Sequence, residues 1–283
     1  MPTVDSLRGL TLLPIPVSAP FNLQPIPVPS RPALPGDTLV RGGNAPAPTS
    51  SDDPRIGFLS DLYWSISSSS AQRLLAIQAL GNCRTSAAVA QLQRIYGDDT
   101  QDNDLRQAAL PALGKTRTDE AVAALAGIYD NTFDSAVQQA VIPALGATRR
   151  PGAVVQLVRI FSNTFDGNLQ QAVIPALGAT RTDDAVAALM NIYRSRSYDG
   201  NVQQGVIAAL GETRSPAAVA LLMQLYNDIA LQSLQMSALK ALGATHTGDA
   251  IAQLQGIYQN SFDDQTRLAA LQAIATASEP TDT

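Results

Sequence analysis

Hydrophobic residues recur along most of the chain at intervals of three and four, the spacing that places them on one face of an α-helix. Between Asp134 and Gly146 this spacing is followed by Val137, Ala140, Val141, Ala144 and Leu145. After a short turn a second amphipathic stretch follows, and each such stretch closes with an aliphatic–aromatic pair such as Ile128-Tyr129. The pattern predicts pairs of short helices.

The helix pairs repeat at a fixed period. The tripeptide Ala-Leu-Gly recurs at steps of 33, 32, 32, 33 and 32 residues, with its glycine at Gly81, Gly114, Gly146, Gly178, Gly211 and Gly243. The segments 133–149 and 165–181 differ at three of 17 positions, which indicates tandem duplication. Helices of about 11 residues are marginal alone and must stack on their neighbours. The sequence therefore predicts an all-α fold, an α-solenoid of about seven helical hairpins over residues 51–276, followed by a short polar tail at 277–283.

Capping residues mark where the predicted helices begin and end. Side chains that cap helix N-termini precede the second helix of five repeats: Thr85, Thr118, Thr182, Ser215 and Thr247. In the remaining copy Arg150 takes this place and is followed by Pro151, which suits a first helical turn. We expect the repeated glycine, for example Gly146, to end each first helix in a left-handed conformation.

The first fifty residues have a different character. They contain 11 of the 18 prolines and repeat the unit Pro-Ile-Pro-Val, which favours an extended polyproline II path. Their apolar side chains predict an arm that docks in a groove of its own or a neighbouring subunit, and a floppy tail is the alternative. The arm residues are Pro14, Ile15, Pro16, Val17, Phe21, Pro25, Ile26, Pro27 and Val28.

The repeat resembles a known family. Ala-rich apolar segments ending in Ala-Leu-Gly, a Thr/Asp or Pro turn and then Ala-Val-x-x-Leu are similar to the short HEAT-like repeats of bacterial α-solenoids, a class also found in phycobilisome lyases. The resemblance covers residues 54–274. A helix position that is commonly Arg in that family is Arg73, Arg106 and Arg267 here, but Gln138, Gln170, Gln203 and Gln235 in the middle repeats.

Charge and composition narrow the function. Lys and Arg number 19 against 24 Asp and Glu, which disfavours nucleic-acid binding and a basic pocket. One Cys and one His exclude a disulfide framework and a His/Cys metal cluster. No apolar run approaches a membrane span, and no signal peptide is expected, so we expect a protein of the cytoplasm or of a larger protein assembly.

Conventional catalytic groups are not evident. His246 and Cys83 occupy turn positions that other repeats fill with Arg and Thr, and they lie five repeats apart. The turn arginines are Arg84, Arg117, Arg149, Arg181 and Arg214. We interpret them as an inter-repeat ladder in which each Arg lies near the Asp of an adjacent turn, rather than as a ligand-binding ridge.

The Ala-Leu-Gly helix carries a second ladder, which consists of Gln107, Gln139, Gln171 and Gln204. Four residues later come Pro111, Pro143, Pro175 and Ala208, and each proline removes the donor for the carbonyl of its Gln. Amides and freed carbonyls on a concave face are suited to pairing with an extended peptide. The alternative is that the prolines set superhelical curvature while the glutamines are merely solvated.

These observations favour a non-enzymatic interaction or assembly scaffold without a cofactor. It would bind protein partners or further copies of itself through the concave face and the arm. The resemblance implies an alternative, an accessory subunit or chaperone of an enzyme such as a chromophore (bilin) lyase. A bilin carries two propionates and would need clustered arginines.

Overall fold

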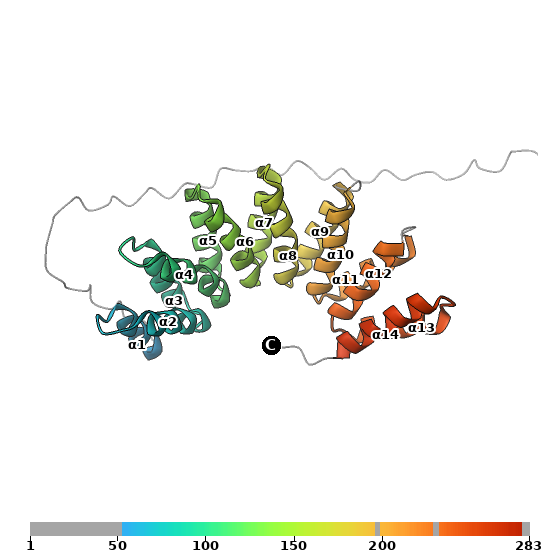
Figure 1. Ribbon diagram of the computed structural model, residues 1–283, viewed down its shortest axis with the longest axis horizontal. Coiled ribbons are helices and arrows are strands. Elements are labelled where there is room, and N and C mark those ends of the chain that lie inside the picture. Colours follow the sequence, from blue (N-terminus) through green and yellow to red (C-terminus); the bar gives the residue numbers. More distant parts are fainter. Residues whose placement is uncertain (1–52, 196–198, 229–231, 279–283) are drawn as a thin grey trace, which may run out of the picture. The chain divides into compact units, whose positions relative to one another are not determined.

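A computed structural model describes residues 53–195, 199–228 and 232–278. The chain divides into two units, Met1–Ala47 and Pro48–Thr283, and every described residue belongs to the second. The predicted arm lies outside the described residues. The described residues form fourteen α-helices and no strand, so the prediction of an all-α solenoid is confirmed. Figure 1 shows the helical pairs following one another in a row.

The helices alternate between two layers. The even-numbered layer holds the Ala-Leu-Gly helices α2 (Ser70–Asn82), α4 (Asn103–Thr116), α6 (Ser135–Ala147), α8 (Gly167–Ala179), α10 (Gly200–Glu212), α12 (Gln232–Ala244) and α14 (Asp264–Ser278). The odd-numbered layer holds α1 (Pro54–Trp64), α3 (Ser86–Gly97), α5 (Asp119–Asn131), α7 (Pro151–Asn163), α9 (Asp183–Ser195), α11 (Pro216–Asp228) and α13 (Gly248–Asn260). Neighbouring even-numbered helices pack more closely than neighbouring odd-numbered ones. Successive pairs are therefore closer together in the even-numbered layer and further apart in the odd-numbered layer.

The predicted N-caps are confirmed. Thr118 accepts a hydrogen bond from the Ala121 backbone N–H at 3.2 Å, and equivalent bonds start α3, α9, α11 and α13. Arg150 precedes α7 without a side-chain cap, and Pro151 is the first residue of that helix. Aspartates cap α6, α8, α10 and α14 instead, as where Asp134 accepts from the Ala136 backbone N–H at 2.8 Å. Side-chain caps thus mark the start of most described helices, and α4 and α7 begin without one.

The predicted role of the repeated glycine is wrong. Gly146 lies inside α6 and is buried, and the left-handed residue is Arg149, at φ 53°. A Cβ atom on Gly146 would lie 2.5 Å from the carbonyl oxygen of Ala176 in α8, which is far inside van der Waals contact. The five equivalent glycines meet the next even-numbered helix in the same way. The glycine is therefore needed because two helix backbones touch there.

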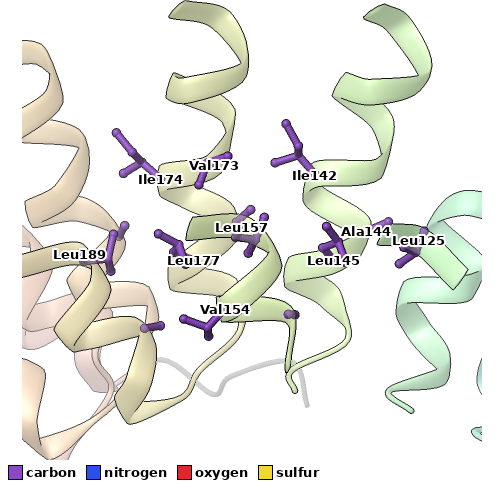
Figure 2. Packing of buried hydrophobic residues seen from close by; sticks show 14 of the residues in the cluster. Leu125, Ile142, Ala144, Leu145, Val154, Leu157, Val173, Ile174, Leu177 and Leu189 are labelled. Carbon is purple, nitrogen blue, oxygen red and sulfur yellow. The ribbon is translucent and has the colours of Figure 1, made fainter. Parts of the chain in front are cut away.

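The core lies between the layers and is continuous along the row. Figure 2 shows Leu125, Leu145 and Leu157 pointing into the space between helices of successive repeats. All three are fully buried, as are most of the aliphatic residues that the periodicity marks. Burying one such side chain stabilises the fold by about 1.5–3 kcal/mol. Each hairpin completes its core only with its neighbours, as expected of a solenoid.

The Arg/Gln position on the even-numbered helices has a structural role. Arg106 donates from Nε to the carbonyl oxygen of Tyr96 at 2.9 Å, ten residues back at the end of α3. Gln170 donates in the same way to Phe161, at 3.3 Å, and to Thr164, at 2.9 Å. Both side chains tie an even-numbered helix to the end of the preceding odd-numbered one. Gln therefore replaces Arg here with a similar hydrogen bond and one charge fewer.

Candidate functional site

One face of the even-numbered layer is open to solvent and carries the predicted Gln ladder. All four glutamines, Gln107, Gln139, Gln171 and Gln204, are exposed, and so are Pro111, Pro143, Pro175 and Ala208 one helical turn further on. Gln204 donates to the Ser237 hydroxyl at 3.2 Å, which links the equivalent positions of two neighbouring repeats. The structure therefore gathers these residues on one polar, mostly uncharged surface.

The prolines do not break their helices. α4, α6 and α8 continue without interruption through Pro111, Pro143 and Pro175. A proline inside a helix costs about 3 kcal/mol relative to alanine and leaves one carbonyl without its intrahelical donor. Because Gln107, Gln139 and Gln171 are the residues four positions earlier, their carbonyls are the ones freed. Three successive even-numbered helices thus each contain a carbonyl that lacks its usual intrahelical donor, at an exposed glutamine.

The turn after each even-numbered helix is built around an arginine in an unusual conformation. Arg84, Arg117, Arg149, Arg181, Arg214 and His246 have φ angles of 51–54°, in the left-handed region. A non-glycine residue pays about 1–2 kcal/mol there. The Arg149 backbone N–H donates to the Gly146 carbonyl at 3.2 Å, which ends the helix. The hydroxyl of Thr148 donates to the Leu145 carbonyl at 2.7 Å.

These turns line up and enclose a hollow of about 640 Å³, which we call the arginine hollow. Its lining contains Arg84, Arg117, Arg149, Arg181 and Arg214, together with Lys115, His246, Asn82, Glu212 and three alanines. It therefore collects residues from six successive repeats at the C-terminal ends of the even-numbered helices. Six cationic side chains meet there with one carboxylate, in a chain whose net charge is −5.

The charges in the arginine hollow influence one another strongly. The pKa of Arg149 is lowered to about 10, first by burial and then by the charges of Arg181, Arg117, Arg214 and Arg84. Burial and the charge of Arg84 lower the pKa of Arg117. Arg84 and Arg214, two repeats away, contribute to this shift, in agreement with the five arginines lining one hollow.

Glu212 is the one acid lining the arginine hollow. Burial raises the pKa of its carboxyl group, and the charge of Arg181 acts in the opposite direction. Glu212 lines the hollow although the residue as a whole is exposed. One carboxylate cannot neutralise six cations, so the hollow retains a large positive charge.

The expected Arg–Asp ladder is not found. Ion pairs between described residues are Arg55–Asp53, Arg106–Asp99, Arg150–Asp119 and Arg159–Asp130, and none of them includes an arginine of the hollow. The aspartates instead cap helix N-termini at the opposite ends of the even-numbered helices, for example Asp134 and Asp166. The expectation that the chain lacks a basic pocket is also wrong. That expectation rested on the net charge of the chain. Net charge does not reveal that one arginine from each of five repeats lines the same hollow.

His246 and Cys83 occupy the turn positions predicted for them. His246 replaces the arginine in the last turn of the hollow, and its Nδ1 atom is buried without a hydrogen-bond partner. Cys83 takes the place of the buried threonines and donates from Sγ to the Ala79 carbonyl at 3.4 Å. Burial raises the pKa of the Cys83 thiol, which disfavours the thiolate.

A set of exposed phenylalanines was not anticipated from the sequence. Phe133, Phe165 and Phe262 each lie two residues before an even-numbered helix, and all are completely exposed. We call them the aromatic row. The recurring Thr/Ser-Phe-Asp tripeptide was the signal, but it stands among polar turn residues and outside the helical periodicity.

None of the helices in the described part of the chain has the length and apolar character needed to cross a membrane.

These features define an α-solenoid of paired helices with an exposed polar face and a basic hollow. The family model for HEAT repeats matches residues 62–146 and 192–275, more than half of the chain. The protein therefore belongs to the HEAT repeat family. No curated protein matches its sequence.

The solved structures to which the chain is similar have low sequence identity. The CpcE–CpcF complex of phycocyanin lyase from Nostoc sp. PCC7120 is 21% identical, with a TM-score of 0.43, over 86% of this chain and all of that one. An archaeal HEAT-like repeat protein from Thermococcus onnurineus NA1 is 12% identical, with a TM-score of 0.40, over 78% of this chain and 96% of that one. Lipovitellin is 14% identical with a TM-score of 0.58, and the match covers 79% of this chain but only 26% of lipovitellin. These likenesses concern the fold.

Proposed function

We propose that this protein is a non-enzymatic scaffold that binds protein partners or further copies of itself. The aromatic row carries the proposal. Phe133, Phe165 and Phe262 expose their whole side chains at one repeated position, although covering a phenylalanine is worth about 1.5–3 kcal/mol. Repeated exposure of large apolar groups beside a polar face is typical of a surface that a partner covers.

The Gln ladder supplies a second element of the same surface. Exposed amides of Gln107, Gln139 and Gln171 can donate and accept, and the carbonyls freed by the prolines can accept. An extended polypeptide offers alternating donors and acceptors that match such a surface. The apolar, proline-rich sequence of the N-terminal arm favours an extended path, and a proline-restricted chain would lose less entropy on docking than a flexible one. We propose that the arm of one copy docks on the solenoid of a neighbour.

The proposal is tested by the mass in solution and by direct binding of the arm. Light scattering on the full chain is expected to give a mass above 29.7 kDa, and a version that begins at Ser50 is expected to be monomeric. A labelled peptide of residues 10–35 is expected to bind that shortened version, and the double variant Phe133→Ser/Phe165→Ser is expected to bind it at least tenfold more weakly. A monomeric full chain together with an arm peptide that does not bind would contradict the proposal.

The arginine hollow favours a second candidate, an accessory subunit or chaperone of an enzyme such as a chromophore lyase. A bilin carries two propionates, and the clustered guanidinium groups that such a ligand needs are present in the hollow. Titration of the full chain with biliverdin is the test. A saturable change in the visible absorbance of biliverdin that is lost in the variant Arg149→Asn/Arg181→Asn would support this role. An unchanged spectrum would contradict it.

A further inference from the structure

We propose that the arginine hollow binds a compact anion that carries two or more phosphoryl groups. The ligand would lie among the converging side chains of Arg117, Arg149 and Arg181 and accept several of their hydrogen bonds at once. The proposal concerns the C-terminal ends of the even-numbered helices. It does not depend on the scaffold role, which is assigned to other residues, and it names a different ligand for the hollow from the bilin of the second candidate.

The first argument is that the arginines are present despite the fold's own preference. Each stands in a left-handed turn, where glycine or asparagine is the favoured residue. Six successive turns nevertheless carry Arg or His, and their side chains point into a shared hollow. Glycine would avoid the cost of about 1–2 kcal/mol, and the favourable interaction of a cation with a helix C-terminus returns only about 0.3–1 kcal/mol. The side chain is therefore the feature that this position supplies.

The second argument is that the cluster is incomplete without an anion. No ion pair between described residues reaches the hollow arginines, whereas Arg150 and Arg159 on the odd-numbered layer both have aspartate partners. Burial and the neighbouring positive charges together lower the pKa of Arg149, one of the side chains that line the hollow. His246 adds a buried Nδ1 atom without a partner at the end of the hollow. A bound anion would relieve the repulsion and accept hydrogen bonds from the guanidinium groups.

The third argument selects the chemistry of the anion. A carboxylate offers two acceptor oxygens and one negative charge, whereas a phosphoryl group offers three oxygens and a higher charge and can be shared by more arginines. A phosphoryl group carries about −1.5 to −2 charges at neutral pH, so two or three of them balance the net charge of the hollow. Its volume of about 640 Å³ is that of a small-molecule site. A nucleic acid needs phosphate contacts over a longer surface, and the rest of this chain is acidic.

The test uses the full chain and inorganic tripolyphosphate, titrated by isothermal calorimetry at constant ionic strength. We expect one site with a Kd in the micromolar range, and a thermal midpoint that rises with ligand but not with sodium chloride of equal ionic strength. The variant Arg149→Asn/Arg181→Asn should bind about 100-fold more weakly. Its own midpoint should not fall, because asparagine tolerates the left-handed turn and the repulsion is reduced.

A charge-matched control separates the hollow from the overall charge. The variant Arg150→Asn/Arg159→Asn removes two positive charges from the odd-numbered layer, and we expect its Kd to stay within twofold of the parent. Equal weakening in both double variants would overturn the proposal, because binding would then be diffuse. Absence of saturable heat would also overturn it. So would a hexaglutamate peptide that binds as tightly as tripolyphosphate, because the site would then recognise an acidic peptide.

Discussion

Replacing Gly146 with alanine tests whether contact between helix backbones sets the spacing of the repeats. The added methyl group would lie 2.5 Å from the carbonyl oxygen and 3.0 Å from the Cα atom of Ala176. Both atoms belong to the backbone of α8, so no side chain can rotate away. The helices α6 and α8 would have to move apart.

Two opposing terms decide the size of the effect. Alanine is a better helix former than glycine by about 1 kcal/mol, which favours the variant. Overpacking typically costs about 1–3 kcal/mol, and a clash with backbone belongs at the upper end. We therefore expect the free energy of unfolding to fall by about 2 kcal/mol. Separation of α6 from α8 also loosens the contacts of Leu145 and Leu177, which adds to the loss.

The chain offers a matched control in Gly127→Ala. Gly127 also lies inside a helix, α5, but a Cβ atom there would meet nothing within 4 Å. The same substitution should therefore stabilise the protein by up to about 1 kcal/mol. Urea unfolding followed by helical circular dichroism measures both variants against the parent.

The sign of the difference between the two variants is the critical result. If Gly146→Ala were as stable as Gly127→Ala, or more stable than the parent, backbone contact would not be the reason for the glycine. Equal destabilisation of both variants would also refute the reasoning, because helix propensity predicts the opposite sign for Gly127.

Three further predictions concern the core, the turn and the surface. Leu145→Ala should lower the free energy of unfolding by about 2–5 kcal/mol and Leu271→Ala by less, since Leu145 is fully buried and Leu271 is 45% exposed; equal losses in urea unfolding would argue against a linear array. Thr148→Val should cost about 1–2 kcal/mol in the same assay, because it leaves the Leu145 carbonyl without the hydroxyl donor. The hydrogen bond from Arg150 lowers the pKa of Asp119 in the folded protein. The stabilisation that this bond gives is therefore fully present above the unfolded pKa of Asp, near 4, and is lost as the pH falls through the lower pKa of the folded state. An Asp119→Asn variant should therefore lose less stability than the parent between pH 5 and 2 in thermal melts.

The helices, their N-caps and their stacking were predictable because each depends on local sequence. Thr118, Thr182 and Thr247 show their capping role through the helical period that follows them. The glycine of Ala-Leu-Gly was misassigned because glycine serves two purposes, a left-handed turn and close approach of backbones, and only a neighbouring helix distinguishes them. The turn in fact uses Arg149, whose left-handed φ angle no propensity favours.

The candidate site was predictable only in its parts. The glutamines, prolines and arginines were all identified as repeating positions, since a fixed period makes equivalent residues visible. That the arginines line one common hollow could not be derived from the sequence, because one residue in every 32 or 33 contributes little to composition or net charge. Arg149 and Arg84 are 65 positions apart in the sequence, yet their charges interact across the hollow.

The glycine–alanine contacts also determine how the array can deform. Where backbones of α6 and α8 touch through Gly146 and Ala176, the two helices cannot approach further, and separating them breaks a close-packed seam. The odd-numbered helices have fewer contacts with one another and can spread at lower cost. We therefore expect the array to bend mainly by changes in the spacing of the odd-numbered helices, while the spacing of the even-numbered helices stays fixed. The glutamines and arginines of successive repeats, which lie on or directly after the even-numbered helices, would then keep a constant spacing while the odd-numbered helices move.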